Sequence, residues 1–261
     1  MPVRAVSMKP PRDDWDRHWR DYAESAASNP AQAYRRRLVV RLLASAEDET
    51  PARVLDIGSG TGDLAAEIRK AFPAAELLGL DVSAGAVEHA AGKVPAATFL
   101  QRDLVSESEP EPAHRGWATH AVCSEVLEHV EDPEALLANA RPYLAPGCRL
   151  IVTVPGGPMS AFDRHIGHRR HFTADSVRAL LEQAGFVVER STRAGFPFFN
   201  LYRLIVLLRG ERLVDDVAHG AGGRPARLLM RIFGVLFRLN LTSSPWGWQV
   251  LATARVPGRR S

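Results

Sequence analysis

The stretch Val54-Leu-Asp-Ile-Gly-Ser-Gly-Thr-Gly62 decides the fold class of this 261-residue chain. Its apolar first half predicts a buried strand that ends near Asp56, and Gly58, Gly60 and Gly62 follow directly. Glycine lets the backbone turn sharply and approach a ligand closely, because it carries no Cβ. The spacing differs from the GxGxxG of dinucleotide sites, and the lysine of a P-loop is missing. The stretch alone therefore indicates either a nucleotide-like ligand or a structural turn.

Around this stretch, predicted strands and helices alternate along the chain. The sequence predicts strands over 52–57, 76–80, 97–100, 119–124, 148–154, 186–193 and 248–256, and helices over 62–71, 83–91, 133–143 and 174–184. Such alternation is typical of parallel βαβ units in a doubly wound α/β sheet. Two more helices are expected between Trp15 and Ala46, after a flexible N-terminus over 1–14. We treat 15–261 as one domain.

Composition limits the function classes without selecting one. The chain is 46% hydrophobic with a formal net charge of +3, so it can bury a core under a weakly basic surface. Such a surface is compatible with anionic substrates, nucleic acid or anionic lipid. Cys123 and Cys148 lie in apolar runs and are expected to be small core residues, which fits a reducing cytoplasm. No secretory signal is recognisable, and no run reaches the roughly 18 apolar residues of a membrane span.

Two further acidic residues follow the next two strands. Asp81 ends the strand over 76–80, and a carboxylate there can accept hydrogen bonds from both hydroxyls of a ribose. Asp103 follows the strand over 97–100, where it either meets an adenine amino group or caps a helix or turn. Ligands of doubly wound sheets bind outside the carboxyl ends of the strands. These acids and the glycine stretch are therefore expected to share one site.

Residues 53–135 resemble the class I S-adenosylmethionine-dependent methyltransferase core, close to the ubiquinone-biosynthesis and small-molecule methyltransferases. Four stretches carry the resemblance in the right order: Val54–Gly62, Leu80–Ser83, Gln101–Leu104 and Ser124–Val130. It implies a Rossmann-like sheet of seven mostly parallel strands with an antiparallel last hairpin. Roughly residues 195–245 separate the last two strands here, as a helical insertion that is expected to form a substrate lid.

By this resemblance the cofactor is S-adenosylmethionine and the product is S-adenosylhomocysteine. Asp56 and Gly58 would approach the methionine part, and Asp81 the ribose. Asp103 and Leu104 would approach the adenine. The expected cofactor-binding residues are Asp56, Ile57, Gly58, Gly60, Asp81, Val82, Asp103, Leu104, Ser124 and Glu125, of which the last two would line the floor near the sulfonium.

Two clusters of residues are candidates for the chemistry of methyl transfer. The transfer is an in-line displacement, and a general base is needed when the acceptor is a hydroxyl of high pKa. The first cluster is Glu125-x-x-Glu128-His129, whose side chains would share a face if the segment is helical. The second is the histidine-rich run 163–172, either a site above the cofactor pocket or a solvated basic loop. The candidate catalytic residues are His168, as first choice, and His129, His165 and His171; Arg169 and Arg170 are candidates for holding a carboxylate or phosphate.

The two clusters together also resemble the metal site of small-RNA 2′-O-methyltransferases and of ubiquinone-pathway O-methyltransferases. The matching residues are Glu125, Glu128, His129 and His168, a mixed oxygen and nitrogen set that suits Mg²⁺, Mn²⁺ or Zn²⁺. Such a cation would lower the pKa of a substrate hydroxyl and replace a base. In the alternative, which we favour, no metal binds and Glu128 lies near a helix N-terminus.

The insertion contains an apolar run over 196–209, a glycine-rich stretch over 215–224 that is expected to be a mobile loop, and an amphipathic stretch over 225–241. The apolar run is too short to cross a membrane. The amphipathic stretch carries Arg227, Arg231 and Arg238 beside its apolar side chains and resembles an interfacial helix. Three interpretations stay open: a buried helix pair over the pocket, an apolar substrate lid, or a peripheral membrane contact through 196–241.

The leading hypothesis is a cytoplasmic enzyme that methylates a hydroxyl or amine of a bulky, partly apolar small molecule. A secondary metabolite, a quinone-like compound and a lipid-linked glycan all fit that description. One alternative is a nucleic-acid methyltransferase, such as an RNA 2′-O-methyltransferase, and the other is a cofactor-binding domain without turnover. Nucleic acid is disfavoured because no RNA-binding module is added and no Asn/Asp-Pro-Pro-aromatic motif follows the strand over 119–124.

Overall fold

The computed structural model describes residues 14–44, 51–107, 109–210 and 224–258. In this part of the chain seven strands form one sheet in the order β3-β2-β1-β4-β5-β7-β6. The strands are β1 Arg53–Ile57, β2 Glu76–Asp81, β3 Thr98–Gln101, β4 Ala118–Ser124, β5 Leu144–Pro155, β6 Val187–Ala194 and β7 Gln249–Arg255. Strands β1 to β5 pair in parallel, whereas β7 is antiparallel to both β5 and β6. The predicted doubly wound sheet with an antiparallel last hairpin is thereby confirmed.

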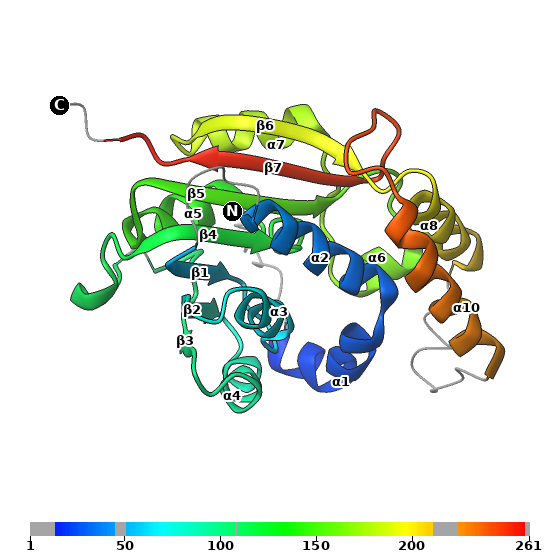
Figure 1. Ribbon diagram of the computed structural model, residues 1–261, viewed down its shortest axis with the longest axis horizontal. Helices are drawn as coiled ribbons and strands as arrows, with labels where there is room; N and C mark the ends of the chain where they lie inside the picture. Colours follow the sequence, from blue (N-terminus) through cyan, green and yellow to red (C-terminus); the bar gives the residue numbers. More distant parts are fainter. Residues whose placement is uncertain (1–13, 45–50, 108, 211–223, 259–261) are drawn as a thin grey trace, which may run out of the picture.

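The helices lie on both faces of the sheet and at its carboxyl edge (Figure 1). They are α1 Trp15–Ser28, α2 Pro30–Ala44, α3 Asp63–Ala71, α4 Ala84–Lys93, α5 Pro133–Ala140, α6 Ala161–His165, α7 Ala174–Gln183, α8 Phe198–Arg209 and α10 Arg224–Leu236, with short 3-10 helices η1 Pro112–His114, η2 Arg141–Tyr143 and η3 Phe237–Leu239. The two helices expected before the first strand are α1 and α2. The expected flexible N-terminus and glycine-rich loop fall, apart from Asp14 and Arg224, outside the described residues.

Each face of the sheet has its own apolar core, because successive side chains of a strand point to opposite faces. Leu55 and Ile57 of β1 belong to the core under α5 and α7, whereas Val54 belongs to the core under α2 and α3. Cys123 and Cys148 are buried and free, as the apolar runs predicted. Within the described ranges, no helix has the length and apolar character needed to cross a bilayer.

A third core joins the N-terminal helix α2 to the insertion. Tyr34 and Leu38 of α2 pack with Phe199 of α8, with Phe233 of α10 and with Phe237 of η3. The described part of the insertion contains α8, α10 and η3, and α10 and η3 pack against α2. In Figure 1, α1, α6, α8 and α10 gather on the side toward which β1 points.

The register aligns the carboxyl ends of the central strands. Ile57 of β1 lies opposite Leu80 of β2 on one side and opposite Cys123 of β4 on the other. Asp81 and Ser124, the last residues of β2 and β4, therefore reach the same edge as the loop after Ile57. This edge is where the sequence places the candidate site.

Candidate functional site

The loop after β1 forms a tight cradle in which a side chain would collide with its neighbours. Gly58, Gly60 and Gly62 all have positive φ, at 72°, 50° and 77°. A Cβ on Gly58 would overlap Val126, and one on Gly60 would lie 2.6 Å from the ring of Trp19. The sequence needs glycine at these positions because both the backbone conformation and the space exclude a side chain.

Asp81 fixes this loop and lies at the edge of the cradle. Its two carboxylate oxygens accept hydrogen bonds from the backbone N–H of Gly60, at 2.8 Å, and of Ser83, at 2.9 Å. The side chain is buried, and burial raises its pKa. Each carboxylate oxygen can accept more than one hydrogen bond. Asp81 therefore keeps the capacity to accept hydrogen bonds from ligand hydroxyls.

Asp56 is a buried carboxylate with an unsatisfied oxygen. It is only 5% exposed, and its Oδ2 has no hydrogen-bond partner among the described residues. Burial raises its pKa to about 7, and the nearby charge of Asp81 adds to the effect. A buried polar group without a partner costs stability, so this position fits a group that receives a donor from a ligand.

The residues expected around an adenine, Asp103 and Leu104, follow β3, and the expected cofactor-binding residue Val82 follows β2. The carboxylate of Asp103 accepts hydrogen bonds from the Val105 N–H, at 3.1 Å, and from the Ser106 hydroxyl, at 2.9 Å. Asp103 therefore caps a turn, the alternative that its sequence context left open. Leu104 is buried and Val82 is 37% exposed.

Glu125 lies in a buried polar network. Its Oε1 accepts hydrogen bonds from Gln249 Nε2, at 2.8 Å, and from Thr153 Oγ1, at 3.1 Å, while its Oε2 lies 2.8 Å from Arg35 Nε. The hydroxyl of Ser124 lies 2.8 Å from that of Thr153. The sequence pointed to neither Arg35 nor Gln249, because these residues belong to α2 and β7, which are far from Glu125 along the chain.

The segment 125–129 is a bend and a turn, not a helix, and Glu125 has a φ of 58°. The shared face expected for Glu125, Glu128 and His129 is therefore absent. Among the described residues, the group of possible metal ligands here is Glu128, His129 and His168, without Glu125. The side chain of Glu125 is held away by its partners Arg35 and Gln249.

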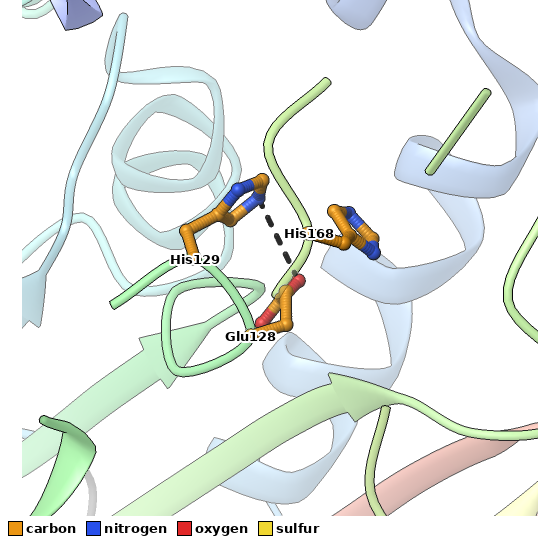
Figure 2. A group of neighbouring side chains, drawn as sticks. All are labelled: Glu128, His129 and His168. Carbon is orange, nitrogen blue, oxygen red and sulfur yellow. Dashed lines mark ion pairs between the residues drawn. The ribbon is translucent and has the colours of Figure 1, made fainter. Parts of the chain in front are cut away.

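Glu128, His129 and His168 form a compact cluster (Figure 2). One candidate ligand atom from each residue lies within 4.8 Å of the others, and Glu128 Oε1 is 3.9 Å from His129 Nε2. Glu128 is fully buried, and neither of its carboxylate oxygens has a hydrogen-bond partner among the described residues. Burial, with a contribution from Glu125, holds the pKa of Glu128 well above its usual range.

The loop after α6 is tied to this turn through its backbone. The Arg169 N–H donates to the Glu128 carbonyl, and the Arg169 guanidinium donates to the His129 carbonyl, both at 2.8 Å. Arg170 donates to the Glu131 carbonyl at 2.8 Å. The histidine-rich run is thus packed onto the end of β4, and the side chains of Arg169 and Arg170 contact backbone carbonyls.

A hydrogen-bond chain assigns the tautomers of two histidines. His171 Nδ1 lies 3.0 Å from the Gly157 carbonyl, which can only accept, so His171 carries its proton on Nδ1. Its Nε2 then accepts from His168 Nδ1, 3.2 Å away. His168 is left with Nε2 as its accepting nitrogen. Burial lowers the pKa of His168 far below the usual range, so the ring is neutral at pH 7.

Asp163 anchors the same loop from α6. It forms a buried two-pronged ion pair with Arg203 of α8, at 2.8 and 2.6 Å, and accepts from the Ser160 N–H and hydroxyl, each at 2.7 Å. These donors hold the pKa of Asp163 below its usual value, against the effect of burial. His165, at the end of α6, is exposed and lies outside the cluster.

Helix α1 covers the cradle, which the sequence did not indicate. Asp16 accepts hydrogen bonds from the Ser83 hydroxyl, at 2.5 Å, and from the Gly85 N–H, at 3.1 Å. Trp19 lies on Gly60, and the ring of Trp15 meets that of His129 edge-on, with centroids 5.0 Å apart. The glycine loop and the histidine cluster are therefore covered by the same helix.

A separate cavity of about 580 Å³ lies at the far edge of the sheet, beside the end of β6. It is lined by Arg193, Phe196, Asn200, Pro245, Trp246 and Trp248. None of the expected site residues lines it, so it is distinct from the cradle.

Comparison with known proteins identifies the family of this chain. A family model described as a methyltransferase domain matches residues 31–191. Trans-aconitate 2-methyltransferase of Methylobacterium nodulans is 35% identical over 201 residues, covering 73% of this chain and 76% of that protein. Malonyl-[acyl-carrier protein] O-methyltransferase of Halalkalibacterium halodurans is 30% identical over 148 residues, covering 56% of this chain and 50% of that protein.

A solved structure shows the same fold at low sequence identity. Phosphoethanolamine N-methyltransferase 2 of Haemonchus contortus, in complex with phosphomonomethylethanolamine and S-adenosylhomocysteine, gives a TM-score of 0.60 at 15% identity. The match covers 95% of this chain and 61% of that one.

Proposed function

This chain belongs to the class I S-adenosylmethionine-dependent methyltransferases, and from that premise we propose that it methylates a hydroxyl or amine of a bulky, partly apolar small molecule. The observation that carries the proposal is the adjacency of two parts under α1. Trp19 covers the glycine cradle, and Trp15 contacts the cluster of Glu128, His129 and His168. A ligand in the cradle would lie beside that cluster.

The residues of the cradle fit the cofactor. The unsatisfied Asp56 carboxylate suits the ammonium of its methionine part, and the Asp81 carboxylate suits the ribose hydroxyls. The collisions that a Cβ would make at Gly58 and Gly60 support close approach of a ligand to this backbone. When bound, the cofactor supplies a methyl group on a positively charged sulfur, which leaves as the neutral thioether of S-adenosylhomocysteine.

The chain's own contribution is to hold the acceptor in line with that methyl group, which alone accounts for much of the acceleration in such displacements. His168 accepts a hydrogen bond from the acceptor through Nε2, and His171 fixes the tautomer that makes this acceptance possible. Because burial depresses the pKa of His168, its role is to orient the nucleophile and polarise its O–H or N–H bond.

A second candidate, with a divalent cation, is favoured by one observation: both oxygens of the buried Glu128 lack partners. Glu128, His129 and His168 would hold the cation, which would lower the pKa of an acceptor hydroxyl. The neutral imidazole of His168 suits a ligand, whereas the raised pKa of Glu128 disfavours the ionised carboxylate that a cation needs. Elemental analysis of the purified protein and activity after chelation separate the candidates. Full activity with no bound metal excludes the cation.

The acceptor class is tested by a transfer assay with methyl-labelled S-adenosylmethionine. The panel should contain trans-aconitate, a malonyl thioester, a hydrophobic phenol and a hydrophobic amine, because two relatives carry the first two compounds in their names. We expect the label in the phenol or amine. Labelling of trans-aconitate alone would contradict the proposed apolar acceptor while leaving methyl transfer intact.

The same assay separates the two remaining alternatives. Labelling of RNA at ribose hydroxyls, with a gel shift by the protein, would support a nucleic-acid methyltransferase. Cofactor binding without S-adenosylhomocysteine release from any acceptor would support a domain without turnover.

A further inference from the structure

Helices α8 and α10, with η3, each expose large apolar side chains to the solvent. On α10 and η3, Leu228, Ile232, Val235 and Leu239 follow helical spacings of four, three and four residues, so they form one stripe. On α8, Leu201, Leu204 and Leu208 form a second stripe at spacings of three and four. The exposed fractions are 60%, 46%, 61% and 65% on the first stripe and 47%, 43% and 78% on the second. We call these seven residues the apolar face.

The apolar face is exposed although its helices are packed. Phe233 and Phe237, on the opposite side of α10 and η3, are buried against Tyr34 of α2 and Tyr202 of α8. Each helix therefore already buries one apolar side within the domain. The apolar side that faces the solvent is not used for packing within the domain. Exposed apolar patches on soluble domains mark interaction surfaces.

The surroundings of the apolar face are cationic. Arg231 and Arg238 lie on one flank of the α10 stripe, and Arg209 ends α8. The pKa of Arg37 on α2 is lowered mainly by burial and also by the charge of Arg238, so these two arginines lie near each other. The described stretches 194–210 and 224–258 contain no aspartate or glutamate. A second copy docked through the same face would bring Arg231 and Arg238 toward their counterparts in the other copy, and like charges oppose that contact. An anionic lipid surface supplies both the apolar interior and the compensating charge.

We propose that the apolar face, with its flanking arginines, docks onto an anionic lipid bilayer. The exposed Trp246, held to α8 through the hydrogen bond from Asn200 to its carbonyl, suits the headgroup layer at the rim. If the protein docks in this orientation, the position of α8 matters for the acceptor, a point that rests on the proposed function. Arg203 of α8 is buried against Asp163 beside His168, while Leu201 and Leu204 on either side of it are exposed. Helix α8 would therefore lie between the bilayer surface and the loop that carries His168.

The proposal is tested by co-sedimentation with vesicles of phosphatidylcholine alone and of phosphatidylcholine with phosphatidylglycerol. We expect wild-type protein to pellet with the anionic vesicles and to be released by salt. The variant Val235→Glu is expected to lose at least tenfold in partitioning, because it puts a charge into the bilayer boundary. Its matched control is Val187→Glu, since Val187 at the start of β6 is 58% exposed and Val235 is 61% exposed. The control is expected to bind like wild type.

A double variant tests the charge separately. Each arginine near an anionic surface strengthens binding about fivefold, so Arg231→Gln with Arg238→Gln is expected to weaken partitioning about 25-fold. Three results would overturn the proposal: no binding to anionic vesicles, equal loss in Val235→Glu and Val187→Glu, or a dimer in solution that Val235→Glu dissociates. All variants should bind S-adenosylmethionine like wild type, so failure of vesicle binding leaves the proposed methyl transfer untouched.

Discussion

Replacing Asp56 by Asn should stabilise the protein without ligand and weaken cofactor binding at the same time. Burial raises the pKa of Asp56 from 3.8 to about 7. One pKa unit corresponds to about 1.4 kcal/mol, so keeping this carboxylate ionised in the folded state costs about 4 kcal/mol. Asn has nearly the same shape and carries no charge. Asp56→Asn therefore removes the free-energy cost of the buried charge. It also removes the negative charge that a cationic ligand would bind.

The sign of the pH dependence follows from the same pKa. The folded protein binds the Asp56 proton more tightly than the unfolded chain does, so this stabilisation is complete below pH 3.8 and is lost as the pH rises to about 7. Near pH 4 the free energies of unfolding of wild type and Asp56→Asn should be similar. At about pH 8 the variant should be more stable by up to about 4 kcal/mol.

Urea unfolding of the ligand-free proteins across this pH range is the assay, with titration calorimetry of S-adenosylmethionine beside it. The cofactor should bind ten- to a hundredfold more weakly to the variant, because a charged hydrogen bond contributes about 1.5–3 kcal/mol. Asp175→Asn, at an exposed position in the first turn of α7, is the control and should change stability by less than about 1 kcal/mol. Equal stability of wild type and Asp56→Asn at about pH 8, together with unchanged affinity, would refute the reasoning.

Three further predictions concern the parts around Asp56. Arg35→Ala should lower the free energy of unfolding by about 3 kcal/mol, because it leaves the buried Glu125 without its cation; urea unfolding measures this. Gly58→Ala should abolish cofactor binding in calorimetry, because φ is positive and the added Cβ overlaps Val126. Trp19→Ala should accelerate release of S-adenosylmethionine in stopped-flow measurements, because it uncovers the glycine cradle.

Each of these has a matched control in the chain. Arg178→Ala breaks an exposed pair with Glu182 and should cost less than about 0.5 kcal/mol. Gly92→Ala, at an open position in α4, should leave cofactor binding unchanged. A loss in Arg35→Ala no larger than in Arg178→Ala would show that the buried pair does not stabilise the fold. An unchanged release rate in Trp19→Ala would show that Trp19 of α1 does not retain the cofactor.

The elements of the fold were predictable because their signals are local. Each of these signals spans only a few residues: the apolar runs, the glycines after β1, and helix caps. One such cap is Ser83, whose hydroxyl accepts a hydrogen bond from the Ala86 N–H. The order of strands followed from the resemblance. The short helix α6 was missed, because a single turn fixed by Ser160 and Asp163 has no periodicity to detect.

The site was predictable only in part, because its remaining contacts join distant positions. Arg35 and Gln249 are separated by 214 positions, and no pattern near Glu125 points to either. The positive φ of Glu125 breaks the helical spacing that would have placed it beside His129. Trp19 belonged to an expected helix, but no local pattern indicates that this helix covers Gly60.

We propose that methyl transfer takes place beside His168, next to the glycine cradle. Initial rates of labelled-methyl transfer to the best acceptor, in wild type, His168→Ala and His165→Ala, test it most directly, with cofactor affinity measured on the same samples. Because His168 orients the acceptor, we expect His168→Ala to lose about a hundredfold in kcat with cofactor affinity unchanged, while the exposed His165→Ala keeps wild-type turnover. Wild-type turnover in His168→Ala would contradict the account.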